Sequence, residues 1–330
     1  MNRWTNAVRW HPALITQATA MVCLAAVCAG GVLLDHRTLA GEPIWLKPLK
    51  FSLSIAAYST SLAWMLSLLP PQRRWPRRAG TVCAVLMAAE QAIIVVQVVR
   101  GRRSHFNNTT SLDADLYLAM ALMIAGLWMA TFLIGLALLR TRFADRAQAW
   151  AVRCGLLVSL GGMLVGVLMT QPTTAQRQAL KHQAHGYVGA HTVGMPDGGP
   201  GLPLTDWSTV TGDLRVPHFV GLHALQVLPL LAIVLGWAAR RWPQLTERRR
   251  VRLVLLGAVV HSGLTGILVW QAERAQSVIH PDGATLAALA GLAALALAGG
   301  VAVLRAPGDP DLRPVPPAPA TPRPLPAPNA

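Results

Sequence analysis

The chain contains few charged residues, and acidic residues are especially scarce. Charged side chains make up 13% of its 330 residues, about half the share of an ordinary soluble domain. Asp and Glu number only 14 against 29 Lys and Arg, which gives a net charge of +15, and hydrophobic residues make up 53% of the chain. So little charge excludes a pair of ordinary soluble domains and favours a membrane protein.

The sequence also lacks the motifs of common catalytic and nucleic-acid-binding sites. It contains no P-loop, nucleophile elbow, HExxH or CxxC, and its basic segments lack a nucleic-acid-binding pattern. The four cysteines (Cys23, Cys28, Cys83 and Cys154) all fall in apolar runs, so the loops hold no disulfide framework. We therefore expect no nucleic acid partner, and any activity has to come from individual polar side chains.

Long uncharged apolar runs are abundant. A run of about 18 or more apolar residues can cross the hydrocarbon core as a helix. We therefore predict an all-α, polytopic membrane bundle over residues 1–305, with the lipid bilayer as its partner. Its eight predicted spans are 13–34, 51–69, 79–99, 117–139, 150–170, 218–239, 251–272 and 284–304.

The distribution of basic residues predicts the orientation of the bundle. Most Arg residues fall in alternate loops, on the side that holds the N-terminus, which is the pattern of cytoplasmic loops. Both termini are therefore expected in the cytoplasm, with the chain in the plasma membrane and its first span retained. The Arg-rich, Lys-poor composition is typical of a bacterial protein. The Pro-rich segment 306–330 is expected to be a disordered cytoplasmic tail.

The loop at residues 171–217 is the one long loop, and it lies on the predicted outer side. We expect it to cap the bundle and to begin with a short surface helix over 174–185. Most histidines and several carboxylates, including Asp197 and Asp206, fall in this loop or in other outer segments. The outer face is therefore the expected location of a functional site.

The outer histidines suggest a metal or haem site. His182 and His185 are three residues apart on the predicted surface helix, a spacing that lets two imidazoles reach one metal, and His191 follows. Histidine suits Zn, Cu or Fe, and a haem between His223 and a loop histidine stays open. The alternative is solvated surface histidines without a ligand. The candidate metal ligands are His105, His182, His185, His191, His218 and His223.

Polar residues in or beside the spans form a second set of candidates. Glu90 lies deep in the third span, where a carboxylate is costly and indicates function by default, with a structural hydrogen bond as the alternative. His261 lies at a similar depth, so the two could form a protonatable pair. His223 and Gln226 share a helix face. The complete set is Glu90, Gln97, Asp213, Arg215, Gln226 and His261.

Trp45, Lys47 and Lys50 lie where the chain enters the second span from the outer side. Such residues are ordinary interface anchors, and this is the interpretation we favour. They could also supply positive charge to an anionic headgroup or substrate.

Several segments resemble a group of bacterial multi-span membrane proteins to which no activity is assigned. These segments are WLKPLKF (45–51), RGRRSHFN (100–107), PDGGPGLP (196–203) and GDLRVPHFVGLHALQ (212–226). The resemblance covers roughly residues 40–235 and implies no activity. Nearly all of these segments fall at the predicted outer face, which is where the resemblance directs attention.

Three functions remain open at this stage. One is an outward-facing His and carboxylate site that binds a metal or haem. Another is a transporter of a small solute or proton that uses Glu90 and His261. The third is a structural membrane protein without activity. A small-molecule or ion ligand is compatible with the first two, and the sequence leaves the oligomeric state open.

Overall fold

The computed structural model describes residues 10–70, 72–181 and 186–306, and these residues fold mainly into α-helices. The predicted tail beyond residue 306 lies outside them. The helices are α1 Pro12–Leu34, α2 Leu46–Ser67, α3 Arg74–Val99, α4 Ser111–Leu139, α5 Arg146–Met169, α6 Thr174–Lys181, α7 Arg215–Ala238, α8 Glu247–Glu273 and α9 Gly283–Arg305. Two short antiparallel pairs join β1 Thr38–Leu39 to β2 Glu42–Pro43 and β3 Thr192–Val193 to β4 Gly212–Asp213.

Every predicted span forms a long helix, and seven of these helices are long and apolar enough to cross a membrane. The prediction of eight such spans was one too high, because α2 is not among the seven. This helix contains lysines near its start and several Ser and Thr residues, of which Ser52 and Ser59 are fully buried. It packs against α1, α3 and α7, so its polar face lies inside the protein.

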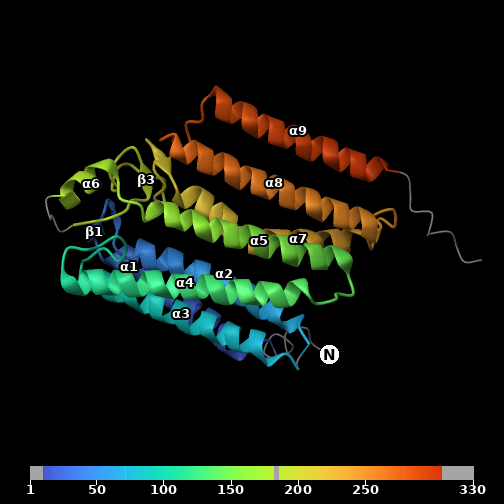
Figure 1. The fold of residues 1–330 in the computed structure, drawn as a ribbon, viewed down its shortest axis with the longest axis horizontal. Helices are drawn as coiled ribbons and strands as arrows, with labels where there is room; N and C mark the ends of the chain where they lie inside the picture. The colour runs from blue at the N-terminus through green and yellow to red at the C-terminus, as the bar shows by residue number, and fades with distance from the viewer. Residues whose placement is uncertain (1–9, 71, 182–185, 307–330) are drawn as a thin grey trace, which may run out of the picture.

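The long helices lie side by side, and successive connections alternate between the two ends of the bundle (Figure 1). One end carries the β1–β2 hairpin, residues 100–110, residues 170–181 with α6, residues 186–214, and residues 274–282; we call it the capped end. The described chain begins and ends at the opposite end. Helix α2 therefore runs the length of the bundle like the others, despite its polar composition.

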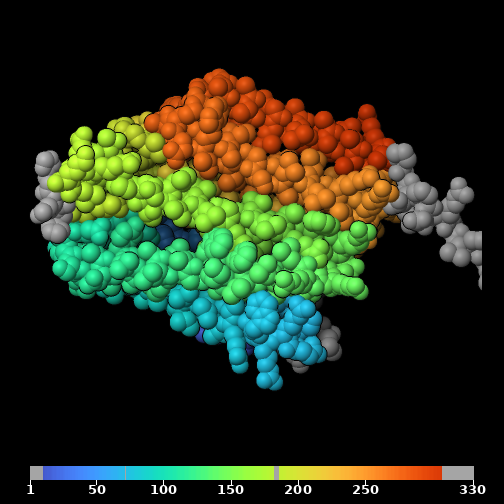
Figure 2. All heavy atoms as spheres, in the orientation of Figure 1, coloured from blue at the N-terminus to red at the C-terminus, as the bar shows by residue number. Residues whose placement is uncertain are grey.

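The helices form two groups that meet along α4–α5 and α2–α7. The first group, α1 to α4, contains most of the largest hydrophobic core, to which Leu156 of α5 and Leu225 of α7 also contribute. The second group holds α5, α7, α8 and α9, with a smaller core around Leu228 and Val254. Figure 2 shows the surface hollowed between the two groups, beside α4 and α5.

Helix starts follow from ordinary side-chain capping. Thr110, Asp145, Thr246 and Asp282 each accept a backbone N–H from the first turn of the helix that follows. Such caps satisfy donors that a helix start leaves without partners. The four caps begin α4, α5, α8 and α9, and so fix where the loops at both ends give way to the spans.

Glycines bring α5 and α7 into backbone contact. A Cβ at Gly162 would overlap the backbone of Gly221 and Leu222, and a Cβ at Gly155 would lie 2.8 Å from the carbonyl oxygen of Ala224. Small residues allow such close approach between membrane helices, whose association relies on packing rather than on the hydrophobic effect.

We predict that Gly162→Ala lowers stability by about 1–3 kcal/mol, because the added methyl overpacks the α5–α7 contact. Gly161→Ala is the matched control, since a Cβ there meets no atom within 4 Å. Thermal unfolding of both variants in detergent measures the difference. Equal melting temperatures for the two variants would contradict this account of the interface.

Candidate functional site

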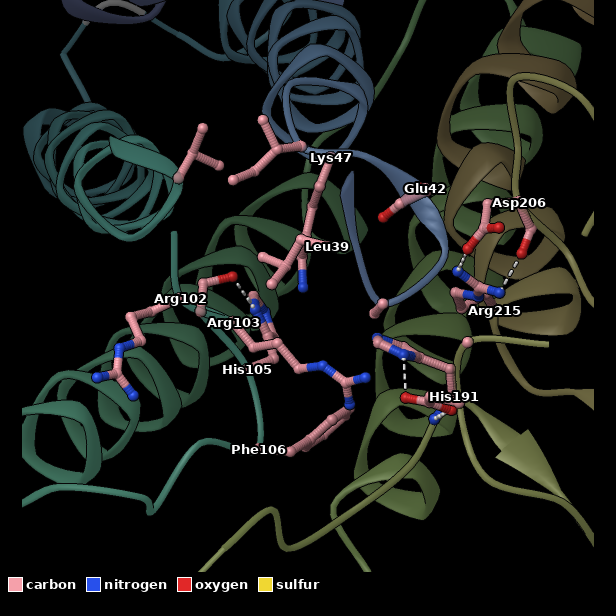
Figure 3. A pocket seen from close by; sticks show the side chains of 16 residues that line it. Leu39, Glu42, Lys47, Arg102, Arg103, His105, Phe106, His191, Asp206 and Arg215 are labelled. Carbon is pink, nitrogen blue, oxygen red and sulfur yellow. Dashed lines mark hydrogen bonds and ion pairs between the residues drawn. The ribbon is translucent and has the colours of Figure 1, made fainter. Parts of the chain in front are cut away.

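A pocket with a volume of about 60 Å³ lies at the capped end. This is room for roughly four water molecules or one small ionic group. Its walls come from both helix groups (Figure 3): the β1–β2 hairpin with the start of α2, the segment after α3, the cap loop around residues 191–206, and the start of α7.

Two basic side chains extend into the middle of the pocket. Figure 3 shows Lys47 and Arg103 pointing inward, whereas Arg102 turns away. The Lys47 ammonium lies 5.9 Å from the centroid of the Phe51 ring and makes no hydrogen bond or ion pair with the described residues. The Arg103 guanidinium lies 4.5 Å from the centroid of the Tyr187 ring. Lys47, for which we favoured the role of an interface anchor, therefore lines the pocket.

Each acidic side chain of the lining already has a basic or imidazole partner. Glu42 accepts from Lys50 at 2.6 Å, Asp197 pairs with His191 at 2.7 Å, and Asp206 accepts from Arg215 at 3.0 Å. Neither Lys47 nor Arg103 forms an ion pair with a carboxylate among the residues that the structure describes. The lining thus presents cations that lack acidic partners but no such carboxylate.

Glu90 of α3 lies beside the pocket, next to one of its walls. It is 3% exposed, and neither carboxylate oxygen has a hydrogen-bond partner. Its Oε1 lies 3.8 Å from Nε2 of His105, a residue that lines the pocket. The positive charge of Lys47 also acts on the Glu90 carboxylate. A buried carboxylate without a partner is costly, so Glu90 is the least satisfied group near this site.

His105 separates Glu90 from the open part of the pocket. Its ring lies 5.6 Å from Phe51 and 6.1 Å from Phe106, measured between centroids, and Nδ1 pairs with the Ser104 hydroxyl at 3.0 Å. Burial and the nearby Lys47 charge lower the pKa of His105 well below its ordinary value. The ring is therefore neutral at neutral pH and leaves Nε2 facing Glu90.

His191 and Asp197 form the wall opposite Lys47. Asp197 Oδ1 also accepts the backbone N–H groups of His191 and Thr192, at 2.9 and 3.1 Å. Burial alone would raise the pKa of Asp197, but hydrogen bonds from His191 and Thr192 outweigh it and hold that pKa below its usual range. Burial lowers the pKa of His191, and Asp197 offsets this only in part.

Arg215 joins α7 to the cap loop. It binds both carboxylate oxygens of Asp213, at 3.0 and 2.7 Å, and Asp206 at 3.0 Å. Asp213 Oδ1 accepts the N–H of Arg215 at 2.9 Å, and Oδ2 accepts the N–H of Ser208 at 2.8 Å. Asp213 therefore organises the start of α7, and Arg215 holds a wall of the pocket in place.

The other polar candidates in the spans have partners away from the pocket. Gln97 donates to Asp113 at 3.0 Å and accepts from Arg100 at 2.6 Å, which fixes the loop after α3. Gln226 contacts His223 at 3.2 Å and donates to Ser61 of α2 at 3.1 Å. These amides tie elements together and do not line the pocket.

Two histidines in the spans pair with backbone carbonyls. His218 Nδ1 lies 2.7 Å from the Gly162 oxygen, and His261 Nε2 lies 2.8 Å from the Val220 oxygen. The structure thus does not bring His261 to Glu90, whose imidazole neighbour is His105. A protonatable Glu90–His261 pair has no contact to support it.

The four candidate metal ligands that the structure describes, His105, His191, His218 and His223, do not form a metal-binding group. No group of three or more His, Cys, Asp or Glu residues in the described part of the chain could hold a metal ion. His105 and His191 share the pocket, but the Phe106 ring contacts both of them, with centroid distances of 6.1 and 5.0 Å. His182 and His185 lie outside the described residues.

The sequence analysis did not single out two charged residues of the pocket, Arg103 and Glu42. It named Asp197 and Asp206 only as outer carboxylates, and it favoured an anchoring role for Lys47. The available signal was the concentration of charged residues in the outer segments of an otherwise charge-poor chain. Arg103 is two residues from the candidate His105. Histidine spacing drew attention to metal chemistry instead.

No protein-family model matches the chain, and no curated protein or solved structure matches it either.

We predict that acidification from pH 7 to pH 5 lowers the stability of the cap, partly through His191. Its pKa in the folded protein is below the ordinary value of 6.5. The unfolded chain therefore binds more protons over this range, and stability falls as pH falls. Thermal unfolding at both pH values should show a smaller loss for His191→Gln than for the parent protein. The control, His280→Gln at an exposed loop position, should keep the parent's full loss; equal losses in all three proteins would contradict the prediction.

Proposed function

We propose that this chain is an integral membrane protein that binds a small polar solute in the capped-end pocket, with Glu90 as part of the binding site. The observation that carries the proposal is the buried Glu90 carboxylate, which has no hydrogen-bond partner. It lies beside a pocket into which the unpaired Lys47 points (Figure 3).

Contrast with neighbouring polar groups supports a ligand. Gln91, the next residue, is similarly buried, and its amide nitrogen donates to Pro48 O at 3.1 Å and to Ser52 at 3.0 Å. Only the Oε1 of Gln91 lacks a partner, whereas both carboxylate oxygens of Glu90 do. Glu90 is the only carboxylate among the described buried groups that lack a partner. Proteins retain such costly groups where a ligand or a reaction uses them.

The proposed orientation places the pocket on the outer side of the plasma membrane. The basic loops belong to the end opposite the cap, where Arg73, Arg142 and Arg240 lie. Positive charge is retained on the cytoplasmic side, so the capped end faces outward and both termini face the cytoplasm. A solute would reach the pocket from outside the cell.

Metal or haem binding is kept as a competing proposal. Since the described residues hold no ready-made metal group, that proposal depends on His182 and His185 acting with His191. Transport through the same pocket is a second alternative. Glu90 and His105, which are in contact, would form the protonatable pair in place of Glu90 and His261. The ligands used in the following test distinguish both alternatives from simple solute binding.

The test is a ligand screen on purified protein in detergent. Thermal unfolding is measured for three proteins in the presence of small acids, amines, sugars and Zn, Cu or Fe ions. They are the parent protein, Leu39→Trp, whose new side chain fills the pocket from the hairpin, and Leu180→Trp, at an exposed position of α6. At least one class should stabilise the parent and the α6 variant but not Leu39→Trp. Bound metal or a haem absorption band would favour the metal proposal. If no class discriminates between the variants, the proposed function is wrong.

We further predict that Glu90→Leu stabilises the protein while abolishing ligand-induced stabilisation. Removing a buried carboxylate without a partner should gain about 1 kcal/mol or more. The matched control is Gln91→Leu, which breaks two hydrogen bonds and should lose about 1–3 kcal/mol. Thermal unfolding of both variants measures the contrast. A large loss of stability in Glu90→Leu would show that the carboxylate is structural.

A further inference from the structure

We propose that the pocket binds a small oxyanion, a carboxylate or a phosphate-type group, and that Glu90 is protonated while the anion is bound. This inference rests on the proposed function, since it names the chemical class of the solute that the same pocket takes.

The charges of the lining favour an anion over a cation. Glu42 and Asp206 are paired with the cations Lys50 and Arg215, and Asp197 is held by hydrogen bonds from His191 and Thr192. Lys47 and Arg103 carry charges that no described carboxylate of the lining pairs with, and both point into the pocket (Figure 3). A cation entering there would meet two like charges, whereas an anion would meet two opposite ones.

The donors of the lining also match an oxyanion. An ammonium supplies three donors, and a guanidinium supplies a planar fork that fits two oxygens of one carboxylate or phosphate. The volume of about 60 Å³ accommodates such a group but leaves little room for a large solute. The pocket would therefore recognise the charged head of a ligand, and a longer ligand would have to extend out of it.

Glu90 has to respond to an anion at this position. The charged or titratable groups that face it are Lys47 from α2 and His105 from the segment after α3. His105 has a lowered pKa because of burial and Lys47, so Lys47 supplies the positive charge. Once an anion neutralises Lys47, a charged Glu90 is left buried beside a like charge. The bound state therefore holds the proton on Glu90.

The experiment is calorimetric titration of the purified full chain with acetate and with sulfate, whose charges are constant between pH 6 and pH 8. Methylammonium, glucose and Zn²⁺ serve as a cation, a neutral solute and a metal. We expect an oxyanion to bind, and its affinity to fall as pH rises, by up to tenfold per pH unit for one linked proton. Repeating the titration in buffers of different ionisation enthalpy counts the protons taken up.

Variants assign the groups. In Glu90→Gln the affinity should fall less between pH 6 and pH 8 than in the parent, and the fall that remains comes from Lys47, whose pKa is lowered by burial to about 8. His105→Gln should retain the full pH dependence of the parent. Lys47→Met should weaken binding at least tenfold. The control Arg102→Gln should leave it unchanged, because that side chain turns away from the pocket. Acetate binding indicates a carboxylate ligand and sulfate binding a phosphate-type one; displacement of sulfate by phosphatidylglycerol would identify a lipid headgroup as the source.

Three results would overturn the inference. If Glu90→Gln keeps the pH dependence of the parent, or if the parent shows none, the protonation of Glu90 is wrong. A second result is that neither oxyanion binds, whereas methylammonium, glucose or Zn²⁺ binds and Leu39→Trp blocks that binding. The pocket is then a ligand site, but its assignment to anions is wrong. If none of the probes binds the parent protein, the proposed function fails with it.

Discussion

Polar side chains in a bundle surrounded by lipid have to find their partners within the protein, because water does not compete for them there. This constraint accounts for much of the interior. His218 and His261 each pair with a backbone carbonyl of a neighbouring helix, and Gln91 ties α3 to α2. Glu90 is the carboxylate that departs from this rule among the described buried groups, and it lies beside the pocket. The proposed function rests on that departure.

The arrangement of the spans was largely predictable because long apolar runs, basic loops and turn residues each act locally along the chain. All the predicted spans became helices with connections at alternate ends. The hydropathy of α2 was overestimated because its Ser and Thr residues, which lower the mean hydropathy of an uncharged run, were not taken into account. Those residues are tolerated since α2 packs against three other helices, a fact that depends on tertiary contacts.

The pocket lies at the end of the bundle where the sequence analysis expected a functional site, but its lining differs in part from the candidate residues. Histidines were prominent candidates because their spacing suggests metal chemistry, yet most of the described ones have ordinary structural partners. Which charges remain unpaired depends on contacts between distant segments. Lys50 donates to Glu42 and to Thr205 O, 155 residues away, while Lys47 makes no such bond. A single sequence read along its length does not distinguish these two lysines.

The position of the pocket between the two helix groups has a mechanical consequence. Glycine contact holds α5 to α7, and Arg215 ties the cap loop to α7. Lys47 and Arg103 belong to the other group. A change in the angle between the groups would change the width of the pocket. A solute bound across the pocket would act as a brace between the two halves of the protein.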